Sequence, residues 1–519
     1  MSLDENIYEI RREKLKKIEA LGHPTYPGRF DYSHTVGQIL TRYSGQTAEQ
    51  LESLRESVQV AGRIMAIRLM GKAGFAHLQQ DGQRLQIYVK KDAIGEPGFE
   101  LWKLLDLGDH IGVRGYLFRT RTGELSVHAE EITFLSKDLL PLPEKFHGLT
   151  DVELRYRQRY LDLIMNPEVR EIFFKRSKLV QSLRRYFDSN GFMEVETPMM
   201  HPIAGGAVAR PFKTHHNTLD MDLFLRIAPE LYLKRLTVGG FDRVYEINRN
   251  FRNEGLGWRW NPEFTMLEAY QAYTDYLGIL DTTQAAIEQT VQAVTGGMKT
   301  NWGEHEIDWS HENWRRLTMR DAIVQFWPEK AGDKPTREDF ATRETVAALV
   351  SRVRAAGIDL KFNSDEPSGK TIAAIFEAVA EEHLMQPTII YEFPTAVSPL
   401  SKQKPDEPEW TERFEMFAGQ MEIANGFSEL NDPEDQRQRF EGQLKERERG
   451  DDEAHQMDEN YINALSYGMP PAGGVGLGVD RLAMLLTDSH TIRDVILFPQ
   501  LRPERDHGTQ HDAPKAHST

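Results

Sequence analysis

Residues 251–270 read FRNEGLGWRWNPEFTMLEAY, a stretch in which two strand-like runs flank a glycine-containing connection. This pattern predicts a β-hairpin. Arg252 would end the first strand with a planar, permanently charged fork that suits a phosphate. Glu254 could accept a hydrogen bond from an amine such as that of adenine, and Phe264 could stack on a base. The same residue types also suit ordinary surface and core positions, so both interpretations stand on this stretch alone.

The composition is typical of a soluble protein with room for several domains. The chain has 519 residues, of which 39% are hydrophobic and 28% are charged, and this length allows about two to four domains. Cysteine is absent, which excludes disulfides, thiolate catalysis and cysteine-ligated zinc. We find neither an apolar run long enough for a bilayer nor a secretory signal, and therefore expect a cytoplasmic protein that binds no membrane.

The charge is strongly negative and unevenly distributed. A formal net charge of −17 argues against broad, non-specific nucleic-acid binding, because phosphate neutralisation requires a basic surface. Residues 1–140 balance their acidic and basic side chains, so the excess negative charge lies downstream. Such an N-terminal module could still bind a folded RNA through local patches. Residues 4–21 are predicted to form a helix whose basic face is either solvated or in contact with RNA.

Residues 58–135 show strand-like patterning, with five candidate strands and a helical stretch near residues 93–106 between the third and the fourth. This order matches an OB-fold, a small barrel that often binds single-stranded nucleic acid. Exposed Phe75, His77 and Gln86 could stack on and read unpaired bases. Phe75 could equally belong to the core.

We predict an α+β protein whose parts follow one another along the chain. Residues 192–200, FMEVETPMM, are predicted to form a strand that Pro198 ends. The predicted parts are an N-terminal helix and lead-in (1–54), an OB-fold domain (55–139), a proline-punctuated linker (140–165), a second domain (166–503) with a helical insertion at about 300–385, and a polar, disordered tail (504–519).

A second predicted hairpin spans residues 413–432, RFEMFAGQMEIANGFSELND. With Gly419-Gln420 as a two-residue turn, Glu415 and Glu422 lie on one face as diagonal neighbours. Like charges so placed repel unless a cation lies between them, and oxygen ligands suit Mg²⁺. The alternative is a solvated hairpin face.

Strict alternation in this hairpin puts Asn425, Phe427 and Glu429 on the face opposite Glu422. A β-bulge near residues 424–426 would bring the two sets into one pocket. Further along, GGVGLGVDRL (473–482) joins glycines, which permit close backbone approach, to Arg481 near a helix start. That guanidinium could hold the far end of a triphosphate.

Taken together, these motifs resemble those of class II aminoacyl-tRNA synthetases. FMEVETPMM, FRNEG…NPEFT…E and GGVGLGVDR are similar to motifs one, two and three of that class. The preceding barrel points to the subclass that activates aspartate, asparagine and lysine. APELYLKR (228–235), EIANGFSELND (422–432) and SHTIRDVILFP (489–499) resemble bacterial-type lysyl-tRNA synthetases in particular. The resemblance covers nearly the full length, apart from the polar tail.

The resemblance implies a six-stranded antiparallel catalytic sheet flanked by helices, beside an OB-fold that binds the anticodon. It also implies a homodimer built partly by the Pro198 strand. The implied activity is that of an aminoacyl-tRNA ligase: Mg²⁺-dependent adenylation of L-lysine by ATP, followed by transfer of the lysyl group to the 3′ end of tRNA(Lys).

Carried over residue by residue, the resemblance implies four groups of site residues. Arg252 and Arg481 would be catalytic and would bind ATP together with Glu254 and Phe264. Glu415 and Glu422 would bind the metal. The lysine pocket would consist of Gly206, Glu230, Glu268, Tyr270, Asn425, Phe427 and Glu429. The anticodon would be read by Phe75, Gln86 and Glu124.

The chemistry of these residues agrees with that activity. The carboxylate of lysine is itself the nucleophile, so no serine, cysteine or histidine base is required. Catalysis then consists of positioning and neutralisation of phosphate charge. A buried Glu429 would pair with the substrate ammonium and would remain unpaired against an uncharged analogue.

One residue departs from the family pattern. The family usually has histidine where this chain has Trp260, and that side chain helps to hold the tail of ATP. Arg259 is the nearest replacement, but on a strand it would point to the other face. Two alternatives therefore remain: a catalytically weak paralogue that binds tRNA or nucleotide, and the paralogue that attaches lysine-like groups to a protein. The N-terminal barrel argues against the second, which lacks one.

Overall fold

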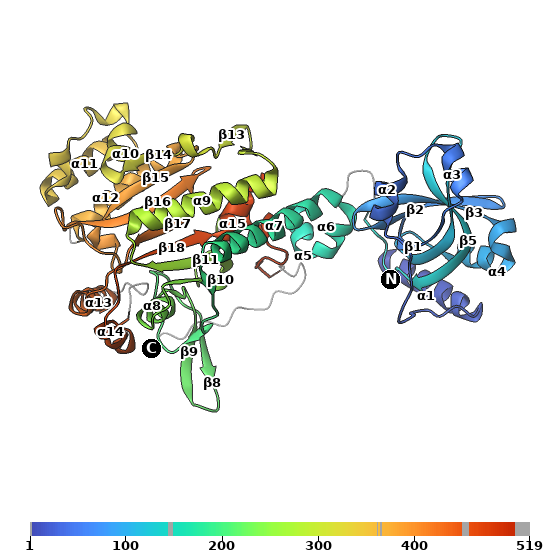
Figure 1. Cartoon of the computed structure of the whole chain (residues 1–519), viewed down its shortest axis with the longest axis horizontal. Helices are drawn as coiled ribbons and strands as arrows, with labels where there is room; N and C mark the ends of the chain where they lie inside the picture. The colour runs from blue at the N-terminus through green and yellow to red at the C-terminus, as the bar shows by residue number, and fades with distance from the viewer. Residues whose placement is uncertain (1–2, 144–148, 361, 364–365, 449–455, 504–519) are drawn as a thin grey trace. The chain divides into compact units, whose positions relative to one another are not determined.

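The computed structural model describes residues 3–143, 149–360, 362–363, 366–448 and 456–503. The predicted tail at 504–519 lies outside the described residues. The chain divides into two compact units, Met1–Arg170 and Glu171–Thr519, and each is described by itself below (Figure 1).

The first unit contains a closed five-stranded barrel, in which the strands are ordered β1-β2-β3-β5-β4. This confirms the predicted OB-fold, with a helix, α4, between the third and fourth strands. A register shift in β1 between Ile64 and Ala66 bends the strand, which then pairs with β2 at one end and β4 at the other. The barrel strands are β1 (Ser57–Met70), β2 (Ala73–Gln80), β3 (Gln83–Lys90), β4 (His110–Arg119) and β5 (Leu125–Ser136).

The helices of the first unit precede, interrupt and follow the barrel strands along the chain. Alternating inward residues of the strands, such as Val58, Val60 and Leu78, form its core together with apolar residues of the helices. The helices are α1 (Leu3–Ala20), α2 (Val36–Tyr43), α3 (Ala48–Leu54), α4 (Lys91–Leu104), α5 (Val152–Arg157) and α6 (Arg159–Met165). The long helix α7 (Pro167–Ser189) begins in this unit and continues into the second.

An eight-stranded sheet forms the centre of the second unit, in the order β14-β15-β16-β17-β18-β11-β10-β6. The expected six antiparallel strands are present from β15 to β10, and each edge adds a short strand that pairs in parallel. The prediction of a six-stranded sheet therefore holds for its centre and misses both edges. The strands are β6 (Met193–Glu194), β10 (Arg243–Phe251), β11 (Glu263–Ala272), β14 (Arg315–Thr318), β15 (Thr388–Pro394), β16 (Trp410–Ala418), β17 (Met421–Ser428) and β18 (Ala472–Gly478).

The predicted strand at 192–200 is mostly not a strand. Only Met193–Glu194 pairs with the large sheet, and Met200–His201 (β7) joins a separate three-stranded sheet with β9 (Met221–Leu225) and β8 (Lys213–His216). Pro198 lies between the two pieces and has no N–H group to donate to a ladder.

Helices cover the large sheet and bury its apolar side chains. Leucine, isoleucine and phenylalanine side chains of α7, α9 and α15 form one core cluster with the central strands. The region predicted as a helical insertion begins with a hairpin of β12 (Lys299–Trp302) and β13 (His305–Asp308) and then packs its helices around a core of its own. The remaining helices are α8 (Glu230–Val238), α9 (Tyr276–Thr295), α10 (Met319–Gln325), α11 (Arg343–Ala355), α12 (Ser368–Val379), α13 (Pro433–Glu448), α14 (Glu459–Ser466), α15 (Val479–Thr487) and α16 (Ile492–Val495), with short 3-10 turns at His311–Asn313, Glu329–Ala331, Arg337–Phe340, Glu381–His383 and Thr395–Val397.

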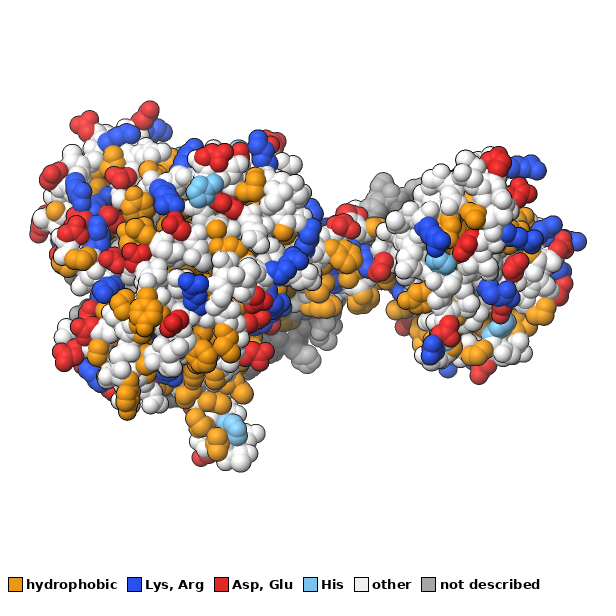
Figure 2. All heavy atoms as spheres, viewed as in Figure 1, with side chains coloured by type: hydrophobic (Ala, Val, Ile, Leu, Met, Phe, Trp, Pro, Cys, Tyr) orange, Lys and Arg blue, Asp and Glu red, His pale blue; other side chains and the backbone are white. Residues whose placement is uncertain are grey.

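The surface carries charges of both signs. Lysine and arginine side chains are interspersed with acidic ones on the face shown in Figure 2. No helix in the described part of the chain is long and apolar enough to cross a membrane.

Candidate active site

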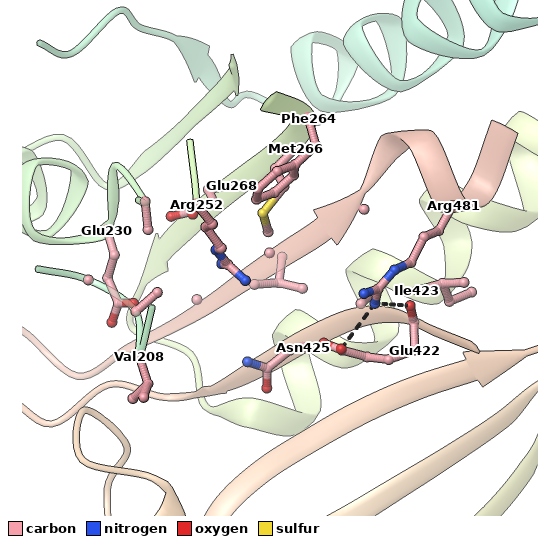
Figure 3. Close-up of a pocket in the computed structure, with 18 of the residues that line it drawn as sticks. Val208, Glu230, Arg252, Phe264, Met266, Glu268, Glu422, Ile423, Asn425 and Arg481 are labelled. Carbon is pink, nitrogen blue, oxygen red and sulfur yellow. Dashed lines mark hydrogen bonds and ion pairs between the residues drawn. The ribbon is translucent and has the colours of Figure 1, made fainter. Parts of the chain in front are cut away.

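A cavity of about 380 Å³ opens on the large sheet, lined by residues of the β10–β11 loop, β11, β17, β18 and the start of α15. Figure 3 shows how the labelled side chains point into it. Most of the residues predicted for ATP and lysine line this cavity: Gly206, Glu230, Arg252, Glu254, Phe264, Glu268, Tyr270, Glu422, Asn425, Phe427 and Arg481. Glu415 and Glu429 do not line it, and the side chains that hold them are described below.

The first predicted hairpin is confirmed. Strands β10 and β11 pair from Arg243↔Gln271 to Phe251↔Glu263, and the segment between them carries the predicted charges. Arg252 follows β10 directly, and its guanidinium carbon lies 5.1 Å from the ring centroid of Phe264. Arg252 forms no ion pair with a described residue, and burial lowers its pKa. A half-buried guanidinium without a counter-ion is suited to an anion.

Arg481 faces the same cavity from α15. Its Nη1 donates to the backbone oxygen of Glu422 at 2.7 Å and to the carboxylate of Glu422 at 3.2 Å. Both contacts are drawn in Figure 3. Strand β17 therefore fixes the position of this arginine before any ligand is present.

The second predicted hairpin is confirmed, and its bulge lies earlier than expected. Gly419 and Gln420 form the turn with φ of 57° and 61°, a conformation that favours glycine at the first position. The register passes from Phe417↔Glu422 to Met416↔Ala424, so Ile423 is the extra residue rather than one of 424–426. The consequence is as predicted, because Glu422 comes to share a face with Asn425.

Glu415 and Glu422 lie near enough to repel each other. Burial raises the pKa of Glu415 to about 8, Arg413 opposes this shift, and Glu422 adds to it. The Nη2 of Arg413 lies 2.5 Å from Glu415 Oε1. Among the described residues no group of three or more potential ligands forms a metal site. The two carboxylates fit a Mg²⁺ that takes its remaining ligands from phosphates and water, which is its usual binding mode at nucleotides.

Beside Glu230 and Glu429, which are predicted to bind lysine, lies a residue that no sequence motif singled out. Lys234 is fully buried; its Nζ lies 2.6 Å from Glu230 Oε1 and also pairs with Glu429 Oε2. Its spacing of four from Glu230 on one helix is a signal that the sequence did contain. Burial raises the pKa of Glu429 to about 8, with Lys234 opposing and Glu230 adding to the shift.

The other oxygen of Glu429 is available. Its Oε1 has no hydrogen-bond partner among the described residues, and a Cβ at Gly474 would lie 2.0 Å from it. Gly474 lines the cavity, so the absence of a side chain there lets this carboxylate reach the ligand space. Gly206 has a φ of 92°, a left-handed backbone conformation that favours glycine.

One further carboxylate and one amide lie beside these residues. Glu268 is buried and accepts a hydrogen bond from Tyr270 Oη at 3.2 Å. Asn425 accepts one from Arg413 Nε at 3.0 Å. Arg413 therefore links Asn425 to Glu415, and no pattern in the sequence singled it out.

Trp260 and Arg259 both line the cavity. The expectation that Arg259 would point to the opposite face is wrong, because these residues lie in the loop and strand alternation does not apply. The guanidinium carbon of Arg259 lies 4.7 Å from the Trp260 ring centroid, and its Nη1 pairs with Glu381 at 3.0 Å. A Cβ at Gly257 would lie 2.4 Å from the Trp260 ring, so this glycine makes room for the tryptophan.

On the barrel, two of the residues predicted for the anticodon, Phe75 and Gln86, lie on the neighbouring strands β2 and β3, and the third, Glu124, lies just before β5. Gln86 Nε2 donates to Glu124 Oε2 at 2.8 Å, and His77 lies 3.0 Å from Glu124 Oε1. Phe75 is half-buried, while Ala76 beside it is in the core. The alternative of a core Phe75 is therefore wrong.

An antiparallel sheet with two arginines over an acidic cavity, in a chain that also has an OB-fold barrel, defines a class II tRNA synthetase. Residues 151–502 match the family described as tRNA synthetases class II (D, K and N), and residues 58–135 match the OB-fold nucleic acid binding domain.

Comparison with curated relatives narrows this class to one family. A lysine--tRNA ligase of Halalkalibacterium halodurans is 49% identical over 510 residues, covering 97% of this chain and 98% of its own. Those of Shouchella clausii and Pelotomaculum thermopropionicum are 51% and 52% identical, each over 96% of this chain and over 97% and 95% of their own. The chain therefore belongs to the lysine–tRNA ligase family, which confirms the resemblance seen in the sequence.

Proposed function

We propose that the protein activates L-lysine with ATP to form lysyl-adenylate and then transfers the lysyl group to the 3′ end of tRNA(Lys). The observation that carries the choice of lysine is the charge of the closed end of the cavity. Glu230 and Glu429 pair with one internal cation, Lys234, and Glu268 is buried beside Glu230. Three carboxyl groups thus share one cation, and the two ammonium groups of lysine would stabilise their ionised forms.

The remaining pocket residues would orient this substrate. Gly206 and Glu230 would bind the α-amino group, while Tyr270 and the free oxygen of Glu429 would bind the side-chain ammonium. Asn425, Phe427 and Glu268 would complete the pocket walls. An uncharged analogue would leave a buried carboxylate without a partner, which disfavours its binding strongly.

In the first step the lysine carboxylate attacks the α-phosphorus of ATP, and pyrophosphate leaves. Arg252 would hold the α-phosphate and the attacking carboxylate, and Arg481 would hold the γ-phosphate. Glu254 would bind the adenine amine, with Phe264 stacked on the ring. Neutralising phosphate charge in a preorganised site is the main contribution to such a reaction.

Glu415 and Glu422 would hold Mg²⁺, which when bound neutralises charge on the phosphates. In the second step a hydroxyl of the tRNA 3′ end attacks the acyl carbon of the adenylate, and AMP leaves. Phe75, Gln86 and Glu124 would bind the anticodon, consistent with their exposed position on an OB-fold.

We also propose a cytoplasmic homodimer. Met193, Met199 and Met200, in the stretch that resembles motif one, are 51%, 44% and 53% exposed. Apolar side chains gathered in one exposed segment are typical of a protein interface. Light scattering on the purified chain measures the oligomeric state, and a monomer at micromolar concentration would contradict this part.

Lysine-dependent ATP–pyrophosphate exchange tests the activation step. We expect exchange that saturates with lysine and is absent with norleucine, which has the same length without the ammonium. A lysine reaction no faster than the blank at saturating lysine would overturn the proposal. Charging of tRNA(Lys) but not of an unrelated tRNA tests the transfer step.

A further inference from the structure

A row of aromatic rings crosses the outer face of the barrel. Phe75 of β2 is paired in register with Tyr88 of β3, Tyr88 with His128 of β5, and His128 with Tyr116 of β4. Successive ring centroids lie 4.9, 5.3 and 4.8 Å apart. All four side chains are half-buried, whereas their sequence neighbours Ala76, Val127, Ala129 and Leu117 belong to the core.

The row lies beside the residues already assigned to the anticodon. His77 pairs in register with Gln86, and Gln86 with Ser126, each two residues along its strand from a ring of the row. Ser126 Oγ donates to Gln86 at 2.9 Å. A row of hydrogen-bonding groups therefore runs parallel to the row of rings, and both start at β2.

Cations lie at both ends of the row. Arg68 is paired in register with Phe75 at one end, and the guanidinium carbon of Arg55 lies 5.1 Å from the Tyr116 ring centroid at the other. Both arginines are exposed, and neither forms an ion pair with a described residue. Burial lowers the pKa of His128, so its ring is neutral at physiological pH and stacks as an uncharged aromatic.

These features match a surface for unpaired nucleotides. Aromatic rings stack on any base, and unpaired arginines beside them bind the phosphates that connect the bases. Only Phe75 of the four rings is used by the proposed anticodon site. At the usual strand separation the other three rings extend roughly 14 Å beyond it, which is enough for about two further nucleotides.

We propose that Tyr88, His128 and Tyr116, with Arg55 at their far end, form a stacking surface for the unpaired loop nucleotides next to the anticodon triplet. This inference rests on the proposed function, because the triplet must occupy the site at Phe75. The surface binds bases without reading their edges, since its rings carry few groups that distinguish one base from another.

Binding of an RNA stem–loop with the anticodon arm of tRNA(Lys) to the full chain tests this surface. Two RNAs are compared by fluorescence anisotropy: the intact stem–loop, and one with abasic sites at the loop positions that flank the triplet. Tyr116→Leu keeps an apolar side chain but removes the ring. We expect it to weaken binding of the intact RNA by about fivefold or more and of the abasic RNA by less than about twofold.

Arg55→Ala provides the second variant, because Arg55 is exposed and its removal leaves the barrel core intact. We expect it to weaken binding of both RNAs to a similar extent, because abasic sites keep the phosphates that Arg55 would bind. The matched control is Arg114→Ala, on the same strand as Tyr116, because Arg114 is already neutralised by Glu131 at 2.8 Å. The control should bind both RNAs as the wild type does.

The possible outcomes separate this inference from the proposed function. Equal losses on the intact and abasic RNAs with Tyr116→Leu, or no loss on either RNA with Arg55→Ala, would overturn the stacking surface alone. Lysine-dependent exchange by the wild-type chain, which needs no RNA, tests the activation step independently. If the wild-type chain binds the stem–loop no better than an unrelated one, the proposed tRNA partner fails and this surface with it.

Discussion

The proposed lysine end and the proposed ATP end of one site are built in opposite ways. At the lysine end, Glu230, Lys234 and Glu429 are 7%, 0% and 1% exposed and already form ion pairs with one another. At the ATP end, Arg252 forms no ion pair with a described residue, and Glu254 is exposed.

The difference indicates how the protein would balance the charge of lysine and the charge of the triphosphate. The protein would balance the small amino acid in advance through a buried network, whose members would be costly to leave unpaired. It would meet the larger charge of the triphosphate with Arg252, which forms no ion pair with a described residue, and with Arg481, which Glu422 holds in place. We therefore expect changes at the ATP end to affect mainly the rate, and changes at the lysine end to affect mainly the choice of substrate.

The largest effect is expected at the ATP end. Arg252→Ala should lower kcat for exchange by about 1,000-fold, because it removes a cation that acts on charge developing at the phosphate. The KM for lysine should change by less than about tenfold. Arg249→Ala, on β10 three residues before Arg252 and 45% exposed, is the matched control and should be near wild type. If the lost activity came mainly from a higher KM for lysine, the division between the two ends would be contradicted.

At the lysine end, Glu429→Gln should lower kcat/KM for lysine by about 100-fold, since a charge-assisted contact with the ammonium is lost. The KM for ATP should stay within about twofold. Exchange kinetics with each substrate varied in turn measure both values. Glu434→Gln, on an exposed side chain of α13, provides the control. An equal rise in the KM for ATP would show that the two ends are not independent.

The buried carboxylates also predict how stability depends on pH. Glu429 has its pKa raised from 4.5 to about 8, so the folded chain keeps a proton that the unfolded chain has lost between these values. The free energy of unfolding therefore falls as pH rises through this window. Without lysine we expect the Tm to fall by about 3 °C between pH 6 and pH 8.5.

Saturating lysine should reduce this fall, because its ammonium stabilises the ionised carboxylate. Differential scanning fluorimetry with and without lysine measures both curves. In Glu429→Gln the dependence on pH should be weaker, and an unchanged slope in that variant would assign the effect to other groups.

The smallest effect is expected at Trp260. Trp260→His should raise the exchange rate by about threefold, the equivalent of one ordinary hydrogen bond to the phosphate tail. Trp258→His is the control, since Trp258 is 46% exposed in the same loop and does not line the cavity. A decrease with Trp260→His would mean that the pair formed by Arg259 and Trp260 already serves this purpose.

The sequence predicted the parts of the molecule that local rules determine. Alternation with a period of two identified the barrel strands, and Gly419-Gln420 identified the turn of the second hairpin. A bulge was predicted because only a bulge brings Glu422 to the same face of the hairpin as Asn425. Its position at Ile423 is seen only in the pairing of the folded strands. The edge strand β14 was missed because its four residues lie in the stretch predicted as a helical insertion. The strand predicted at 192–200 includes β6, but only two of its residues pair with the large sheet.

Residues were missed where contacts come from distant segments. Lys234 and Glu429 are far apart in the chain, and only the fold brings the ammonium between the two carboxylates. Arg413 shows no pattern of its own, although it holds both Glu415 and Asn425. The prediction that Arg259 points away from Trp260 was wrong because Arg259 lies in a loop, where strand alternation does not apply.

The ion pair between Lys234 and Glu429 has a consequence for redesign and for evolution. The β16–β17 hairpin and the residue that follows it carry Glu415, Glu422, Asn425 and Glu429, and this compactness makes the segment look transferable between synthetases as a module. It is not one, because Lys234, which pairs with Glu429, belongs to α8 and would be missing from the new host. A transfer of this specificity to another synthetase must therefore include both α8 and the β16–β17 hairpin.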